Sequence, residues 1–180
     1  MLDELIRELW GEAERLRLPV VAHRKAGAST ALLERYFGQS VPSDVAAWFR
    51  WCDGVAYLPG QTQNDAALVP GYEPLSVTES SAMRRDQLPH PLLLSTFFPM
   101  LGTGGGDFYA AAYELETGRS HIVSVVVGED FRVAYRSVEQ MIETLIACYR
   151  EGVFFVDEDG VFQADDERWI QKEMEAVGFM

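Results

Sequence analysis

A glycine-rich run that ends in an acid is the first segment of this sequence with the residue types of a binding loop. Residues Gly102 to Asp107 read GTGGGD. A phosphate-binding loop needs backbone N–H groups aimed at the anion, usually at a helix N-terminus, and a lysine nearby. Here no Gly-Lys-Ser/Thr follows, the next residues have the composition of a strand, and Asp107 would repel phosphate. The run therefore predicts a tight turn with positive φ, and no cofactor site is predicted.

An acid-rich run near the C-terminus has some features of a calcium loop. Residues Asp157 to Gly160 read DEDG, and Asp165 and Asp166 follow. An EF-hand loop places acids at alternate positions, a glycine at the sixth position and a glutamate at the twelfth. The glycine comes too early in this run, so a hairpin turn is the preferred interpretation and no metal site is predicted. A weak, adventitious site for a divalent cation is the alternative.

The residue types that commonly catalyse reactions are scattered along the chain. His23, His90 and His121 have no cysteine, histidine or acid at metal-ligand spacing. No serine lies in a Gly-x-Ser-x-Gly elbow, and neither Cys52 nor Cys148 lies in a local catalytic signature. Catalytic triads assemble from residues far apart in sequence, so an enzyme of unknown type is kept as the third hypothesis. The preferred prediction is a protein that is not an enzyme and has no catalytic residues.

Two tryptophans on one short predicted helix are candidates for a protein interface. Trp48 and Trp51 lie three residues apart and so project to similar sides of the helix. An exposed tryptophan is a common anchor of protein interfaces. Two arrangements are open: both rings lie in the core, or one ring lies in the core and the other at its rim.

Acidic residues fall mainly at predicted turns and strand ends. One interpretation is structural, because turns favour Asp for its local hydrogen bonds. The other is that several turns at one edge of a sheet pool their charge, attract a basic protein and cover its active site. On this second hypothesis the partner-binding residues are Trp51, Asp53, Asp107, Glu116, Glu129, Asp130, Asp157 and Asp159.

The charge balance limits the class of partner. Fifteen Lys and Arg stand against 28 Asp and Glu, which gives a formal net charge of −13. A field of this sign repels nucleic acids and anionic membrane surfaces and attracts basic proteins. We therefore expect a protein partner, with a basic toxin domain as one candidate, and neither nucleic acid nor membrane. That the acidity only keeps the protein soluble is an equally good interpretation.

The sequence also indicates a cellular compartment. Cys52 and Cys148 lie in apolar helical stretches, where buried free thiols are expected. The first residues, MLDELIREL, are amphipathic and acidic and lack the apolar centre of a signal peptide. No apolar run is long enough to span a bilayer. We expect a cytoplasmic protein.

The elements that must position these residues begin with helices. Apolar residues at three- and four-residue spacing predict a helix over 3–17, which Pro19 ends. Ser29 or Thr30 would cap a short helix that Gly38 stops. The predicted elements that follow are a helix that starts at 42–44 with Ser43 as its N-cap and stops at 53–54, a loop over 58–74, a strand over 75–77 and a helix over 78–85.

The second half of the chain has the pattern of an antiparallel sheet. A strand is expected within 92–98, before the glycine-rich turn. Three further strands are separated by the short turns 116–118 and 128–130, which predicts a three-stranded antiparallel meander. The remaining predicted elements are strands over 108–115, 121–127 and 132–135, a helix over 137–150 capped by Ser137, a hairpin over 153–163 and a helix over 165–177.

Three blocks of the sequence are VPSDVAAWFRWCDGV, PMLGTGGGDFYAAAYELETGRSHIV and VAYRSVEQMIETLIACYREG. In their order and spacing they resemble the SUKH superfamily, which includes a fungal cell-wall regulator of the Smi/Knr type and many bacterial immunity proteins. The resemblance extends over about residues 36–155. The resemblance implies a non-enzymatic domain that binds other proteins. One departure is Ala112, which stands near a position where many members of the family carry an acid.

These expectations combine into one hypothesis. The fold class is α+β, an antiparallel β-sheet with a central meander flanked by helices, with an N-terminal helical extension. Residues 1–30 form a helix and loop docked on the domain, and residues 31–180 form the SUKH-like domain, as a monomer or a homodimer. The resemblance implies an immunity protein that neutralises a bacterial toxin by covering its active face. The alternative is a regulatory scaffold that binds cellular proteins.

Overall fold

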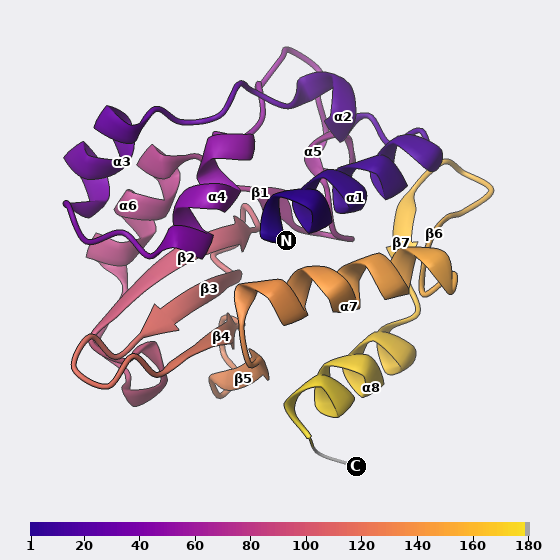
Figure 1. Ribbon diagram of the computed structural model, residues 1–180. Coiled ribbons are helices and arrows are strands. Elements are labelled where there is room, and N and C mark those ends of the chain that lie inside the picture. The colour runs from indigo at the N-terminus through magenta and orange to yellow at the C-terminus, as the bar shows by residue number, and fades with distance from the viewer. Residues whose placement is uncertain (179–180) are drawn as a thin grey trace.

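A five-stranded antiparallel sheet forms the centre of the structure, which is a computed structural model that describes residues 1–178 (Figure 1). Its strands pair in the order in which they occur along the chain, so the whole sheet is a meander. The α+β class, with an antiparallel sheet and an N-terminal helix, is thereby confirmed. The five strands are β1 (Glu73–Pro74), β2 (Thr96–Gly102), β3 (Phe108–Tyr113), β4 (Ser120–Val125) and β5 (Arg132–Tyr135).

Helices and a small second sheet surround the meander. Strands β6 (Phe154–Val156) and β7 (Phe162–Ala164) pair with each other as the predicted C-terminal hairpin. The helices are α1 (Leu2–Arg15), α2 (Val20–His23), α3 (Thr30–Phe37), α4 (Ser43–Trp51), α5 (Gln63–Ala66), α6 (Val77–Asp86), α7 (Val138–Arg150) and α8 (Asp166–Val177), with the 3-10 helix η1 (Pro91–Leu93).

Both faces of the central sheet are covered, because successive side chains of a strand point to opposite faces. Tyr109 and Ala111 of β3 belong to the main core, which the sheet shares with α1, α4 and α7. Phe108, Ala110 and Ala112 face the other way. There they form a smaller core with the segment that contains η1, so this face is covered by a short irregular stretch of chain.

Two local predictions were wrong at element ends. Helix α4 begins at Ser43 itself and Pro42 occupies the N-cap position, so Ser43 is not the cap. The strand expected over 75–77 lies at Glu73–Pro74 instead, because the Ser76 side chain accepts a hydrogen bond from the Glu79 N–H and caps α6. The strand expected within 92–98 is present, and it begins at Thr96, after η1.

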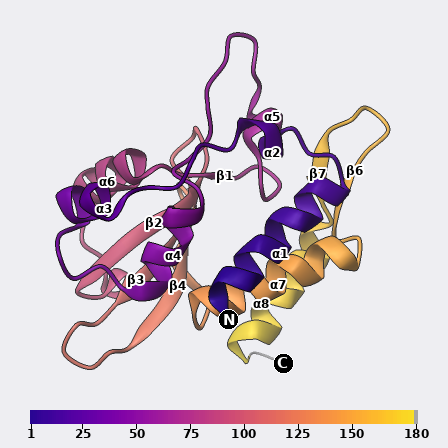
Figure 2. The ribbon, with the colours of Figure 1, turned by 45° about the horizontal axis from the view of Figure 1, so that its top comes forward.

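The N-terminal helix α1 packs along α7 and α4 (Figures 1 and 2). The predicted apolar stripe is buried, with Leu9 and Ala13 fully inaccessible to solvent. At the far end of α1, Glu12 Oε1 accepts a hydrogen bond from Arg150 Nε of α7 at 2.8 Å, and its Oε2 accepts one from Arg15 Nε at 2.7 Å. Burial opposes the ionisation of Glu12, but the two arginines outweigh it and lower the pKa of its carboxyl group.

Replacing Glu12 by glutamine removes the negative charge that pairs with Arg15 and Arg150, and is expected to lower Tm at pH 7 by about 2–4 °C. The loss is small because the arginines are half-exposed and solvent screens the ion pairs. The pKa of Glu12 is lowered in the folded state, so its contribution is complete above the pKa of an unfolded glutamate, about 4.3. The contribution disappears as the pH falls through the lowered folded value. Circular dichroism at pH 7 and pH 3 should therefore show a Tm difference at pH 7 that shrinks at pH 3.

Glu14→Gln is the matched control, since Glu14 is exposed on the same helix. We expect Glu14→Gln to change Tm little at either pH. A Glu12→Gln difference that is the same at both values would show that the carboxylate charge does not hold α1 to α7.

Both cysteines are free and buried, as predicted. Burial raises the pKa of the Cys52 and Cys148 thiols to about 12 in each case. Both groups are therefore neutral thiols at physiological pH. None of the helices in residues 1–178 combines the length and the apolar composition that a membrane span requires.

Candidate protein-binding surfaces

The predicted acidic turns divide between the two ends of the sheet. The β2–β3 and β4–β5 turns lie together, since Asp107 Oδ1 accepts a hydrogen bond from the Val127 N–H at 2.9 Å. Glu129 and Asp130 are exposed in the second of these turns. Glu116 lies in the β3–β4 turn, at the opposite end of the strands. Only part of the predicted set therefore pools its charge at one edge of this sheet.

The glycine-rich run forms the predicted tight turn. The Thr103 N–H donates to the Asp107 carbonyl oxygen at 2.9 Å, and Gly106 has a φ of +100°. Thr103 Oγ1 accepts hydrogen bonds from the N–H groups of Gly105 and Asp107 at 3.2 and 3.1 Å. These two backbone donors are thereby satisfied inside the turn rather than aimed at an external anion.

Asp157 and Asp159 lie in the turn of the β6–β7 hairpin, away from the central sheet. The Asp157 side chain accepts hydrogen bonds from Gln163 Nε2 at 2.7 Å, from the Val161 N–H at 2.9 Å and from the Asp159 N–H at 3.0 Å. The bonds from Gln163 and from the two backbone groups lower the pKa of Asp157. Asp157 thus forms the turn, and Asp159 beside it is exposed.

Asp53 and Trp51 both have structural contacts. Asp53 Oδ1 accepts a hydrogen bond from the Val77 N–H at 2.8 Å, at the first residue of α6. Trp51 is half-buried, and the Arg24 and Arg7 guanidinium carbons lie 4.9 and 6.0 Å from its ring centroid. Trp48 is buried. Of the two arrangements considered for the tryptophans, the structure has one ring in the core and the other at its rim.

Most of the net charge lies in a part of the chain from which the turn-based prediction named Asp157 and Asp159 alone. Residues 137–178, which comprise α7, the β6–β7 hairpin and α8, contain eleven Asp and Glu and three Lys and Arg. Their net charge is −8, out of −13 for the whole chain. We call residues 137–178 the acidic C-terminal unit. A count of charges by segment finds this concentration in the sequence, whereas a search for acids in turns does not.

The acidic C-terminal unit also exposes large apolar side chains. On the hairpin, Phe155, Val156 and Val161 are 41%, 40% and 42% exposed. On α8, Ile170 and Met174 are 51% and 49% exposed and lie four residues apart, on one face of the helix. Exposed apolar side chains surrounded by charged residues are typical of protein-interaction sites.

A buried carboxylate fixes α8 to the central sheet and so determines which face of α8 is exposed. Glu173 Oε1 accepts hydrogen bonds from the hydroxyl groups of Tyr109 and Tyr135, both at 2.8 Å. Its Oε2 lies 2.5 Å from Arg132 Nη2. Burial and the charge of Glu173 raise the pKa of both tyrosines well above the usual value. With Glu173 and Trp169 buried, Ile170 and Met174 face solvent.

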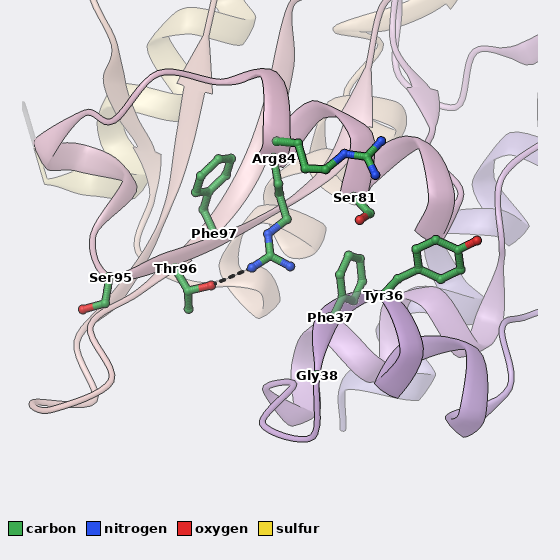
Figure 3. Close-up of a pocket in the computed structure, with 9 residues that line it drawn as sticks. Tyr36, Phe37, Gly38, Ser81, Arg84, Ser95, Thr96 and Phe97 are labelled. Carbon is green, nitrogen blue, oxygen red and sulfur yellow. Dashed lines mark hydrogen bonds between the residues drawn. The ribbon is translucent and has the colours of Figure 1, made fainter.

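A second surface lies on the other side of the molecule, beside α3 and α6 rather than α7 and α8 (Figure 2). It is a hollow of about 580 Å³ between α3, α6 and β2 (Figure 3). The side chain of Arg84 reaches into it from α6, and Tyr36, Phe37 and Phe97 provide aromatic walls. Sequence patterns gave no sign of this hollow, because its three segments are far apart in the chain.

A scan against models of protein families and a search of curated proteins each returned no match to this chain.

Proposed function

We propose that this protein is a protein-binding domain and that its acidic C-terminal unit binds a basic protein. The observation that carries the proposal is the concentration of charge and exposed apolar side chains in one segment. Residues 137–178 contribute −8 to the net charge and also contain five of the large, exposed apolar side chains.

The two features serve successive stages of binding. Charge acts over about 8–10 Å at physiological ionic strength and speeds the encounter with a partner of opposite sign. Apolar side chains act at contact, where each buried group contributes affinity in proportion to the area removed from water. On the hairpin, the exposed acids Glu158 and Asp159 follow the exposed apolar residue Phe155 within a few residues. A basic surface with an apolar centre is the complementary partner.

The SUKH resemblance of residues 36–155 gives the proposal a specific form. On that resemblance the partner is a bacterial toxin, and the protein neutralises it by covering its catalytic face. A nuclease toxin has a basic active face because it binds a polyanion. The sign of the acidic C-terminal unit matches such a target.

Co-expression with the product of the neighbouring toxin gene tests this function. We expect survival of the cells, and a complex of the two proteins on size-exclusion chromatography. Continued killing without a complex would refute neutralisation. Survival of a strain from which the gene has been deleted, with a growth or envelope defect but no toxin present, would instead support the regulatory scaffold.

Charge reversal locates the surface. A double substitution, Glu158→Lys with Asp159→Lys on the hairpin, is expected to slow association about tenfold at low salt and less at high salt. Glu116→Lys with Glu34→Lys is the matched control, since both of these residues are exposed and lie outside the acidic C-terminal unit. Equal slowing by the control pair would show that only the overall charge matters.

A further inference from the structure

An arginine without an acidic partner lies in the hollow between α3, α6 and β2. Arg84 is half-buried, and burial lowers the pKa of its guanidinium group. Within residues 1–178, no carboxylate forms an ion pair with Arg84 or with Arg85 beside it. Removing a charge from water without a counter-charge is costly. In a chain with a formal charge of −13, a half-buried arginine that has no ion-pair partner among residues 1–178 is a candidate for binding an anionic group of a ligand.

The guanidinium group of Arg84 is held in one orientation. Its Nη2 donates to Thr96 Oγ1 at 3.0 Å, and its central carbon lies 4.7 and 5.4 Å from the ring centroids of Phe98 and Phe37. Figure 3 shows the group between Thr96 and the Phe37 ring, with the Ser81 hydroxyl nearby. A guanidinium group has five N–H donors in a planar fork, so several are free for a ligand. Such a fork matches the two oxygens of a carboxylate.

A second, more apolar hollow adjoins the first. A second space of about 460 Å³ shares Ser95 and Phe97 with the first and extends along the segment that contains η1. Pro89, Pro91 and Leu94 line it. Because Ser95 and Phe97 line both, the two spaces adjoin, and we call the pair the groove, with Arg84 on one side of Phe97 and the apolar space on the other.

We propose that this groove binds the C-terminal residues of a partner peptide, with the free carboxylate at Arg84 and an apolar side chain in the apolar half. Charge complementarity supports the carboxylate, since Arg84 and Arg85 are the charged groups that line the groove. A single negative charge is opposed less by the net charge of −13 than a phosphate dianion is. Two adjoining hollows with volumes of about 580 and 460 Å³ offer more space than a small acid fills, and so suit a peptide better.

Titration of the full-length, ¹⁵N-labelled protein tests the ligand. The probe is the peptide acetyl-Ala-Ala-Leu-Phe with a free C-terminal carboxylate, compared with the same peptide as its C-terminal amide and with inorganic phosphate. We expect a Kd of about 1 mM or tighter for the free acid, and binding at least about tenfold weaker for the amide. Amide signals of residues 81–85 and 94–98 should move together. Equal binding of acid and amide, or tighter binding of phosphate, would overturn the proposal.

Substitutions at the groove separate charge from geometry. Arg84→Lys keeps the charge but loses the planar fork and is expected to weaken binding about tenfold. Arg85→Gln, at an exposed position, is expected to weaken it severalfold. Arg119→Gln is the control, since it removes an equal charge from an exposed residue in the β3–β4 turn. A loss in Arg119→Gln as large as in Arg85→Gln would mean that the peptide senses only the overall charge.

None of these substitutions lies in residues 137–178, so the test of the groove is independent of the basic partner proposed for the acidic C-terminal unit. Arg84→Gln is the more drastic variant, and because Arg84 packs on two aromatic rings it also reports on folding. If its amide spectrum shows an unfolded chain, the Arg84→Lys and Arg85→Gln variants decide the outcome. If both of these bind the free acid as the unmodified protein does, the groove is not its site.

Discussion

Replacing Glu173 by alanine is expected to destabilise the protein by about 3–5 kcal/mol. Glu173 is 2% exposed and is the common acceptor for Tyr109, Tyr135 and Arg132. Its removal leaves two buried tyrosine hydroxyl groups without that acceptor, each at a cost of about 1–3 kcal/mol. The Arg132 side chain is 44% exposed and is able to turn towards water, so it contributes the smaller share.

Denaturation with urea measures the effect directly. Glu173→Gln retains an oxygen acceptor but loses the charge, and we expect an intermediate loss of about 1–3 kcal/mol. Glu175→Gln is the control, since Glu175 is exposed on the same helix and its carboxylate accepts a hydrogen bond from Gln171 Nε2. If Glu173→Ala unfolds at the same urea concentration as this control, the network does not stabilise α8.

The Glu173 network also connects stability with the proposed interface. Ile170 and Met174 face solvent because Trp169 and Glu173 hold the opposite face of α8 against the sheet. A variant that frees α8 without unfolding the sheet is therefore expected to lose binding of a basic partner while it keeps the peptide groove at Arg84.

Local sequence signals predicted the meander because each hairpin is specified by residues adjacent in the chain. The turns 116–118 and 128–130 separate strands of the expected length, and the structure has strands on both sides of each turn. The misplaced strand at 75–77 shows the limit of such signals. Leu75 and Val77 have strand composition, but the reciprocal hydrogen bonds of Ser76 and Glu79 start a helix there.

The division of the acidic turns follows from the topology that was predicted. In a meander, successive turns lie at alternate ends of the sheet. The β2–β3 and β4–β5 turns therefore share one end, and Glu116 is placed at the other. The groove at Arg84 could not be predicted from local patterns, because it is formed by segments far apart in the chain. These segments are residues 36–38, 81–85 and 95–97, and no local pattern specifies that α3 and β2 approach α6.

Ala112 stands near the position where many members of the SUKH superfamily carry an acid, if the proposed resemblance holds. The side chain is fully buried, in the smaller core with Leu93 and Val123. Its cross-strand neighbour is His121, whose Nε2 lies 2.7 Å from the Leu92 carbonyl oxygen in the covering segment. Residues around η1 therefore cover this face of β3 and leave no solvent-exposed site for an acid at 112.

Ala112→Glu is expected to cost about 3–5 kcal/mol, because it adds both volume and a charge to a closed apolar space. Urea denaturation measures the loss, and the amide signals of residues 92–94 should report displacement of the covering segment. Ala31→Glu is the control. It makes the same chemical change at an exposed position in the first turn of α3, where an acid interacts favourably with the helix dipole.

The Ala112→Glu result also decides how the resemblance applies to this chain. A large loss of stability means that an acid at this position requires an open face, which this chain has closed with η1. Binding acids must then come from elsewhere, as the concentration of charge in residues 137–178 suggests. If Ala112→Glu instead keeps full stability and strengthens binding of a basic partner, then the covering segment moves readily and this face of the sheet is the interface.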